Sequence, residues 1–233
     1  MKERPILFSG AMVRAILDGS KTQTRRVVNP QPARGWAFET PPVLGRITSS
    51  HPKKERFGAF IRRGVGTDFP EVDLIPCPYG QPGDRLWVRE TFHPIYPQDT
   101  TYNGGKPIEY DYAATYQHGY RLGDTLSIKK RWTPSIHMPR VASRITLEIT
   151  GVRVERLQDI NVADAMAEGV VESNANLRGL VPCMEHRYAY EDLWNKINGS
   201  DSWDENPFVW VIDFRQIDAA TSAAVSLKYA ASS

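Results

Sequence analysis

The residues of this chain that could do chemistry are concentrated in a short stretch near the N-terminus. Residues 18–26 read DGSKTQTRR, which places Lys21, Thr22 and Thr24 directly before Arg25 and Arg26. A lysine three residues before a threonine can form a base–nucleophile pair, and arginines suit an anionic or nucleic-acid ligand. The same string is also typical of a solvated basic turn, so the rest of the chain has to decide between the two interpretations.

A short helix is expected to position this stretch. Residues 6–8 look like a strand, Ser9 is a favourable N-cap for the helix that follows, and Gly19 is a natural terminator of that helix. Residues 21–26 are therefore expected to leave the end of a buried helix as a loop, with a direction that the helix fixes.

Further along the chain, hydrophobic periodicity and turn residues predict several more elements. The expected strands are 84–91, 145–149 (resuming at Val152 and Val154 after a bend or bulge at Gly151) and the central strand 208–214; the expected helices are 162–168, capped by Asn161 and ended by Gly169, and about 184–198. This order favours an α+β fold with a curved antiparallel sheet or small barrel.

Two segments rich in proline and glycine separate these elements. Residues 29–82 are expected to be loops with one or two short strands around 56–62, and residues 93–140 to be loops with a hairpin around 110–116. The tail, 219–233, is rich in alanine and serine and is expected to be disordered or a frayed helix. The chain is therefore predicted to be one domain over 1–218 with two long insertions.

Composition excludes several functional classes. No run of about 18 apolar residues is present, so no membrane span is expected, and the N-terminus lacks the pattern of a signal peptide. Two cysteines and five scattered histidines show no metal-ligand spacing, so neither a metal nor a cofactor is expected. We expect a cytoplasmic protein.

Charge is distributed unevenly along the chain. Residues 1–150 contain 22 Lys and Arg against 14 Asp and Glu, a balance of +8, whereas residues 151–233 contain 7 against 13, a balance of −6. A basic portion opposite an acidic one suggests a polyanionic partner, although a linear asymmetry need not form a patch in space.

Four blocks together resemble the ASCH domain, a member of the PUA-like β-barrel superfamily. These blocks are ILDGSKTQTRR (16–26), GDRLWV (83–88), residues 157–169 and WVIDF (210–214). They cover about a quarter of the chain. The longer form of the sequence, with CPYG before the second block and NPFVW near the end, is similar to the version common in phage and prophage genomes.

The resemblance implies a PUA-like curved antiparallel β-barrel with short flanking helices, and a nucleoside or RNA ligand. One small bacterial type of ASCH protein is an amidohydrolase that removes the acetyl group from N4-acetylcytidine. Its proposed catalytic lysine, threonine and glutamate match Lys21, Thr24 and Glu168 of this chain. The long segments 29–82 and 93–140 are absent from those small enzymes and are candidates for a lid, a larger substrate site or a surface that binds a protein partner.

Amide hydrolysis requires a nucleophile, a base and a group that protonates the leaving amine, and the matched residues can be assigned to these roles. A threonine hydroxyl needs a neutral base beside it, and Lys21 is one if burial and the charges of Arg25 and Arg26 lower its pKa. The end of a helix raises the pKa of a carboxylate such as Glu168, which suits a proton shuttle. If Lys21 and Glu168 pair closely, Glu168 instead orients the lysine.

Each of these residues also has a purely structural interpretation. Lys21 and Glu168 would then be a salt bridge that closes a helix onto a loop, and Thr22 and Thr24 would cap or turn the chain. Arg25 and Arg26 would pair with a carboxylate such as Asp84 instead of contacting a phosphate or a base edge. Four further side chains are of interest: Thr22 and Arg85 are candidate ligand contacts, and Trp87 and Tyr116 could stack on a base or simply pack.

The sequence therefore leaves three functions open. The first is a base-recognising ASCH protein that hydrolyses an N4-acylated cytidine or a similar amide. The second is an RNA-binding module without that activity, or a ribonuclease in which Lys21 and Glu168 act on the phosphodiester. The third is a phage accessory protein that acts on a host partner through the inserted segments.

Overall fold

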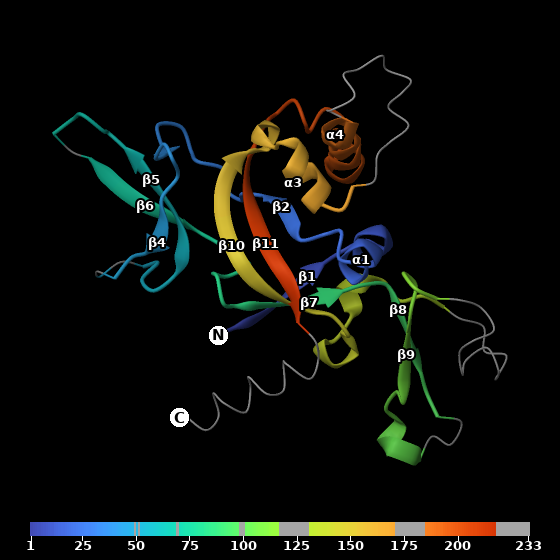
Figure 1. Cartoon of the computed structure of the whole chain (residues 1–233). Coiled ribbons are helices and arrows are strands. Elements are labelled where there is room, and N and C mark those ends of the chain that lie inside the picture. Colours follow the sequence, from blue (N-terminus) through green and yellow to red (C-terminus); the bar gives the residue numbers. More distant parts are fainter. Residues whose placement is uncertain are drawn as a thin grey trace. The chain divides into compact units, whose positions relative to one another are not determined.

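The computed structural model describes residues 1–48, 50, 52–68, 70–97, 101–116, 131–170 and 185–217 (Figure 1). These residues form mostly β-sheet with three α-helices, which confirms the α+β class. The described strands form no closed barrel, so the PUA-like barrel is not confirmed. The predicted disordered tail, 219–233, and Cys183 lie outside the described residues. No described helix is both long and apolar enough to cross a membrane.

The chain divides into two compact units that each draw on several stretches of sequence. Among the described residues, the first unit draws on the ranges 1–2, 20–84 and 148–215, and the second on the ranges 3–19, 85–147 and 216–217. The largest sheet has the strand order β1-β7-β10-β11-β2, in which β10 (Thr146–Arg156) begins in the second unit and continues in the first. The prediction of a single domain with two insertions stays a prediction.

In the first unit, β2 (Gln23–Val27) pairs antiparallel with β11 (Phe208–Ile217), with Thr24 opposite Ile212. The predicted loop over residues 21–26 is therefore wrong, because most of it is an edge strand. β11 lies between β10 and β2, which confirms that it is a central strand. β10 is one continuous strand through Gly151, where a side chain would meet the carboxylate of Asp213. The bend or bulge at Gly151 stays a prediction.

Helices α3 (Val162–Ala167) and α4 (Glu185–Asn198) belong to the same unit. Asn161 caps α3 as predicted, because its side chain accepts a hydrogen bond from the amide of Asp164 at 2.8 Å. Tyr190 and Trp194 of α4 pack with Trp203 in a buried cluster. That cluster, which also includes Leu157, Ile160, Ala165, Val209 and Val211, fixes α3 and α4 relative to β11.

Residues 29–82, predicted to be mainly loops, contain a second sheet. β5 (Phe57–Arg63) pairs antiparallel with β3 (Ala37–Phe38), β4 (Leu44–Arg46) and β6 (Glu71–Pro76). The prediction of one or two strands around 56–62 located β5 and missed its partners.

The second unit is built on a parallel pair and a separate ribbon. β1 (Glu3–Leu7) pairs parallel with β7 (Arg85–Arg89), and α1 (Gly10–Leu17) follows β1, with Ser9 as the predicted N-cap. β8 (Phe92–Ile95) pairs antiparallel with β9 (Glu109–Tyr112). The hairpin predicted around 110–116 is therefore wrong, because β9 pairs with β8, a strand that precedes it by more than ten residues.

Candidate active site

Lys21 and Glu168 meet at the free edge of β2. They form an isolated antiparallel bridge, and beside it the Thr22 amide donates to the carbonyl of Ala167 at 2.8 Å. The carbonyl of Thr22 in turn accepts the amide of Phe214 at 2.9 Å. The chain at Thr22 is therefore held between the end of α3 and β11, and this position brings the side chains of Lys21 and Glu168 together.

All three N–H groups of the Lys21 ammonium can be accounted for. Nζ donates to Glu168 Oε2 at 2.6 Å, to the Glu168 carbonyl at 2.8 Å and to the Gln23 carbonyl at 2.8 Å. Only alternate residues of β2 form backbone hydrogen bonds to β11. The backbone carbonyl of Gln23 points away from β11, so Lys21 supplies its donor. The Glu168 carbonyl needs this donor because it caps the C-terminal end of α3.

Both partners of this contact are shielded from solvent. The Lys21 side chain is 0% exposed and that of Glu168 is 3% exposed. Burial lowers the pKa of Lys21, while the charge and hydrogen bond of Glu168 oppose this effect and the charges of Arg26 and Arg25 add to it. This is the direction that the proposed base requires. Glu168 nevertheless provides a partner for the ammonium form.

Arg25 is buried beside this pair and is surrounded by carboxylates. Its guanidinium lies 2.9 Å from Asp164 Oδ2, 3.1 Å from Glu155 Oε2 and 3.7 Å from Glu168 Oε1. Arg25 also donates to the side-chain oxygen of Gln23. Arg25 therefore has the structural carboxylate pairing that was one of its two interpretations, with partners other than the suggested Asp84.

Lys21, Glu168, Arg25, Asp164 and Glu155 together form a charged cluster. A second arginine extends this charged cluster toward the surface. Arg153 lies 2.5 Å from Glu155, 3.0 Å from Asp164 and 2.8 Å from Asp213, and its side chain is 33% exposed. Gln23 Nε2 donates to both Asp164 (3.1 Å) and Asp213 (2.7 Å). Burial alone would lower the pKa of Arg153, but the hydrogen bond with Glu155 and the charges of Glu155, Asp213 and Asp164 raise it above its ordinary value.

One oxygen of Glu168 is left without a hydrogen bond. Oε1 is buried and accepts no hydrogen bond from any described residue; Arg25 Nη1, at 3.7 Å, is its ionic neighbour. Glu168 also affects Tyr190. Burial is the larger cause, and the charge of Glu168 the next, of a pKa of the Tyr190 phenol that lies well above its ordinary value. The site thus combines a buried amine, an acceptor oxygen with spare capacity and a phenol that stays neutral.

The two threonines differ in their surroundings. Thr24 is buried, and the pleat of β2 places it on the face opposite Gln23 and Arg25. Thr22 is exposed and contributes its backbone to the bridge with α3. Arg26 is half-buried on the same face of β2 as Thr24. The structure therefore brings Lys21, Arg25 and Glu168 together and directs Thr24 to the other face.

The remaining predicted ligand contacts belong to the second unit. Arg85 is buried, with a guanidinium nitrogen 3.9 Å from Glu3. The ring of Trp87 lies under the guanidinium groups of Arg89 (5.6 Å) and Arg140 (6.0 Å). Tyr116 contacts Trp132 edge-to-face, with ring centroids 5.4 Å apart. Each of these side chains thus has partners within its own unit.

Sequence reasoning missed Gln23, Asp164, Arg153, Glu155 and Asp213. One signal was available, because Gln23 and Arg25 alternate with Thr24 as residues of a strand do, and Arg153 and Glu155 alternate in the same way with apolar neighbours. Within the described residues, no group of three or more His, Cys, Asp or Glu is arranged to hold a metal ion.

Comparison with known proteins adds no relative. No family model matches the chain, and no curated protein or solved structure matches it significantly.

Proposed function

We propose that this chain is an ASCH-type protein with a PUA-like fold that recognises a nucleoside base and hydrolyses an N4-acylated cytidine or a similar amide. The observation that carries the proposal is the buried contact between Lys21 and Glu168, in which burial destabilises the ammonium form of a lysine. An amine of lowered pKa next to an orienting carboxylate can act as a general base at a lower pH than an ordinary lysine.

In the proposed reaction, neutral Lys21 takes the proton of the Thr24 hydroxyl as that oxygen attacks the acyl carbon. The C–N bond then breaks, and the leaving amine receives the proton from the Lys21 ammonium. Water hydrolyses the resulting ester, which releases the carboxylic acid and restores the hydroxyl. Glu168 holds Lys21 in place through its 2.6 Å contact.

Thr24 is the member of this set that the geometry supports least, because it occupies the opposite face of β2 from Arg25. Water activated directly by Lys21 is the corresponding mechanism without a covalent intermediate. Comparing Thr24→Ser with Thr24→Ala separates the two mechanisms, because a serine keeps a hydroxyl nucleophile. If both variants retain wild-type turnover, Thr24 has no part in the reaction.

The test is hydrolysis of N4-acetylcytidine, followed by chromatography, with wild type and Lys21 variants compared. We expect Lys21→Ala and Lys21→Arg to lose activity by about 100-fold or more, the range that general-base catalysis contributes. Arginine keeps the positive charge and the donors but cannot release its proton, so a folded, inactive Lys21→Arg separates catalysis from structure. Wild-type turnover should rise with pH through a pKa below the ordinary lysine value of 10.5.

Lys53 provides a matched control within the same unit. Its ammonium also contacts a carboxylate (Asp73, at 2.7 and 2.8 Å) and a backbone carbonyl (Leu74, at 2.8 Å). Lys53→Ala should therefore lose a comparable set of contacts and leave turnover unchanged. Equal turnover in wild type and in folded Lys21→Ala would refute the proposal.

A second candidate function is a nucleic-acid-binding module without hydrolysis. It is favoured by the saturation of Lys21, whose three N–H groups already have acceptors, which is the arrangement of a structural ammonium. A folded wild type that does not hydrolyse the amide, but binds single-stranded RNA with an affinity that falls steeply with salt, would support this candidate. Cleavage of the RNA would instead support the alternative that the protein is a ribonuclease.

A further inference from the structure

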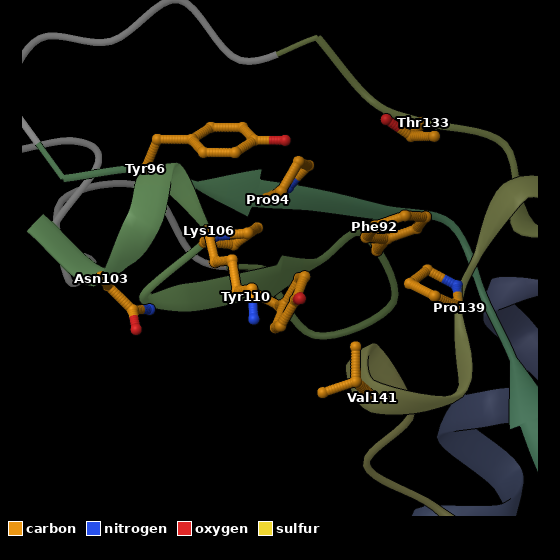
Figure 2. Close-up of a pocket in the computed structure, with 10 residues that line it drawn as sticks. Phe92, Pro94, Tyr96, Asn103, Lys106, Tyr110, Thr133, Pro139 and Val141 are labelled. Atoms are coloured by element: carbon orange, nitrogen blue, oxygen red, sulfur yellow. The ribbon is translucent and has the colours of Figure 1, made fainter. Parts of the chain in front are cut away.

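The second unit contains a pocket that the proposed hydrolysis does not use. It has a volume of about 640 Å³, which is within the range of about 300–1,000 Å³ typical of small-molecule sites. Its walls are formed by the β8–β9 ribbon, by Thr133 and by the turn that contains Pro139 and Val141 (Figure 2).

The pleat of the ribbon decides which side chains enter the pocket. Pro94 is opposite Tyr110 in the register of β8 and β9, and both line the pocket. Phe92 lies on the same face, and its ring centroid is 6.1 Å from that of Tyr110. The carboxylates of Glu109 and Asp111 alternate with these residues and therefore belong to the other face.

Hydrogen bonds hold the other two walls against the ribbon. Thr133 and Phe92 exchange backbone hydrogen bonds of 2.7 and 3.1 Å. The phenol of Tyr112 donates to the carbonyl of Ala142 at 2.9 Å, which ties the turn next to Val141 to β9. The pocket is therefore formed before any ligand arrives, which reduces the entropic cost of binding.

The pocket has an apolar end and a polar end. Phe92, Pro139 and Val141 gather at one end, whereas Asn103 and Lys106 lie at the other (Figure 2). Of the described lining residues, Lys106 alone carries a charge, and the lining includes no carboxylate. Val141 is 78% exposed, so a large apolar side chain at the mouth remains open to solvent.

We propose that this pocket binds a planar aromatic ring that carries an anionic group. The ring packs against Phe92 and Tyr110, and the anion points toward the Lys106 ammonium with the Asn103 amide as an additional donor. An aromatic carboxylate and a nucleoside monophosphate share this chemistry. The proposal rests on this pocket alone and holds whether or not Lys21 is catalytic.

The test is calorimetric titration of the full chain with four probes. The aromatic anions are 2-naphthoate and cytidine 5′-monophosphate, and their uncharged counterparts are 2-naphthol and cytidine. We expect at least one anion to bind at least about threefold more tightly than its counterpart, which corresponds to a partly exposed ion pair. Binding of naphthoate alone assigns the site to a small aromatic acid, and binding of the nucleotide alone assigns it to a nucleotide.

Two variants locate the binding in this pocket. Lys106→Met should remove the preference for the anion, and Val141→Trp should weaken every probe by filling the mouth. Lys54→Met and Val72→Trp make the same changes at exposed positions of the other unit and should leave binding unchanged. The proposal is overturned if neither anion binds to wild type, or if the two pocket variants bind both anions as tightly as wild type does.

Discussion

At the scale of single residues, Asp164 connects most of the charged cluster. Its carboxylate accepts hydrogen bonds from Gln23, Arg25 and Arg153. Replacing it with asparagine leaves a buried guanidinium without its closest carboxylate, so we expect Asp164→Asn to reduce the free energy of unfolding by roughly 2–4 kcal/mol. Chemical denaturation measures this change. Asp204→Asn, at an exposed position, is the control and should change stability very little.

The same substitution should change the pH dependence of stability. Burial alone would raise the pKa of Asp164, but hydrogen bonding from Gln23 and the charges of Arg25 and Arg153 hold it below its ordinary value of 3.8. The stabilisation by this carboxylate is therefore complete above about pH 3.8 and is lost as the pH falls through the lower pKa of the folded state. Wild type and Asp164→Asn should converge in stability at strongly acidic pH, and an equal difference at pH 7 and pH 2 would contradict this.

Sequence alone could place only part of the candidate site. Lys21 and Glu168 were selected because their motifs resemble a known family, and they do lie in contact. Arg153 and Asp213 were missed because their importance depends on β10, β11 and β2 being neighbours, and this pairing joins residues far apart in the chain. Local patterns report which face of a strand a residue occupies, but not which carboxylate lies across from it.

At the scale of secondary-structure elements, Gly151 shows how tightly β10 and Asp213 are packed. A Cβ atom at this position would lie 2.7 Å from Asp213 Oδ2, which itself accepts from Arg153 at 2.8 Å. Gly151→Ala should therefore displace the carboxylate and cost about 1–3 kcal/mol of stability. In an Asp213→Ala background the same change should cost less than half as much, because the obstructing group is gone.

Gly58 in β5 is a useful contrast for this experiment. A Cβ atom there would lie 2.1 Å from the carbonyl oxygen of Ile75 in β6, and a backbone group cannot swing away as a side chain can. Gly58→Ala should destabilise the protein more than Gly151→Ala does, and Asp213→Ala should not relieve it. Equal costs for Gly151→Ala with and without Asp213 would show that the carboxylate is not the obstacle.

The elements that sequence predicted well are those whose signals are local. Ser9 and Asn161 cap α1 and α3 because a side-chain oxygen reaches an amide three residues ahead. β2 was predicted as a loop because its glutamine and arginines, and the lysine that precedes it, are polar residues typical of a solvated turn until distant carboxylates are placed around them. β6 was missed for a related reason, since only its pairing with β5 makes its short polar and apolar alternation a strand.

At the scale of the whole molecule, the uneven distribution of charge along the chain is partly cancelled by folding. Lys21 and Arg25 come from the basic portion, and their partners Glu155, Asp164 and Glu168 come from the acidic portion. These charges neutralise one another inside the first unit. They are therefore not available to attract a polyanion, and any binding to nucleic acid has to depend on basic residues elsewhere.

The division into two units predicts where the effect of Asp164→Asn should appear. In the first unit, the amide of Thr22 bonds to Ala167 and that of Glu168 bonds to Asp164. Loosening α3 should open these hydrogen bonds and speed their amide exchange with solvent deuterium, because local openings follow clusters of contacts.

In the second unit, the amides of Phe92 and Ile108 bond to Thr133 and Ile95 and should exchange at the wild-type rate. Exchange measured by mass spectrometry on the folded variant, at a pH where it remains native, distinguishes these responses. If β8 and β9 exchange faster by the same factor as β2 and α3, the variant opens the whole chain together. The charged cluster would then stabilise the molecule as one cooperative unit, and the two compact units would have no separate energetic meaning.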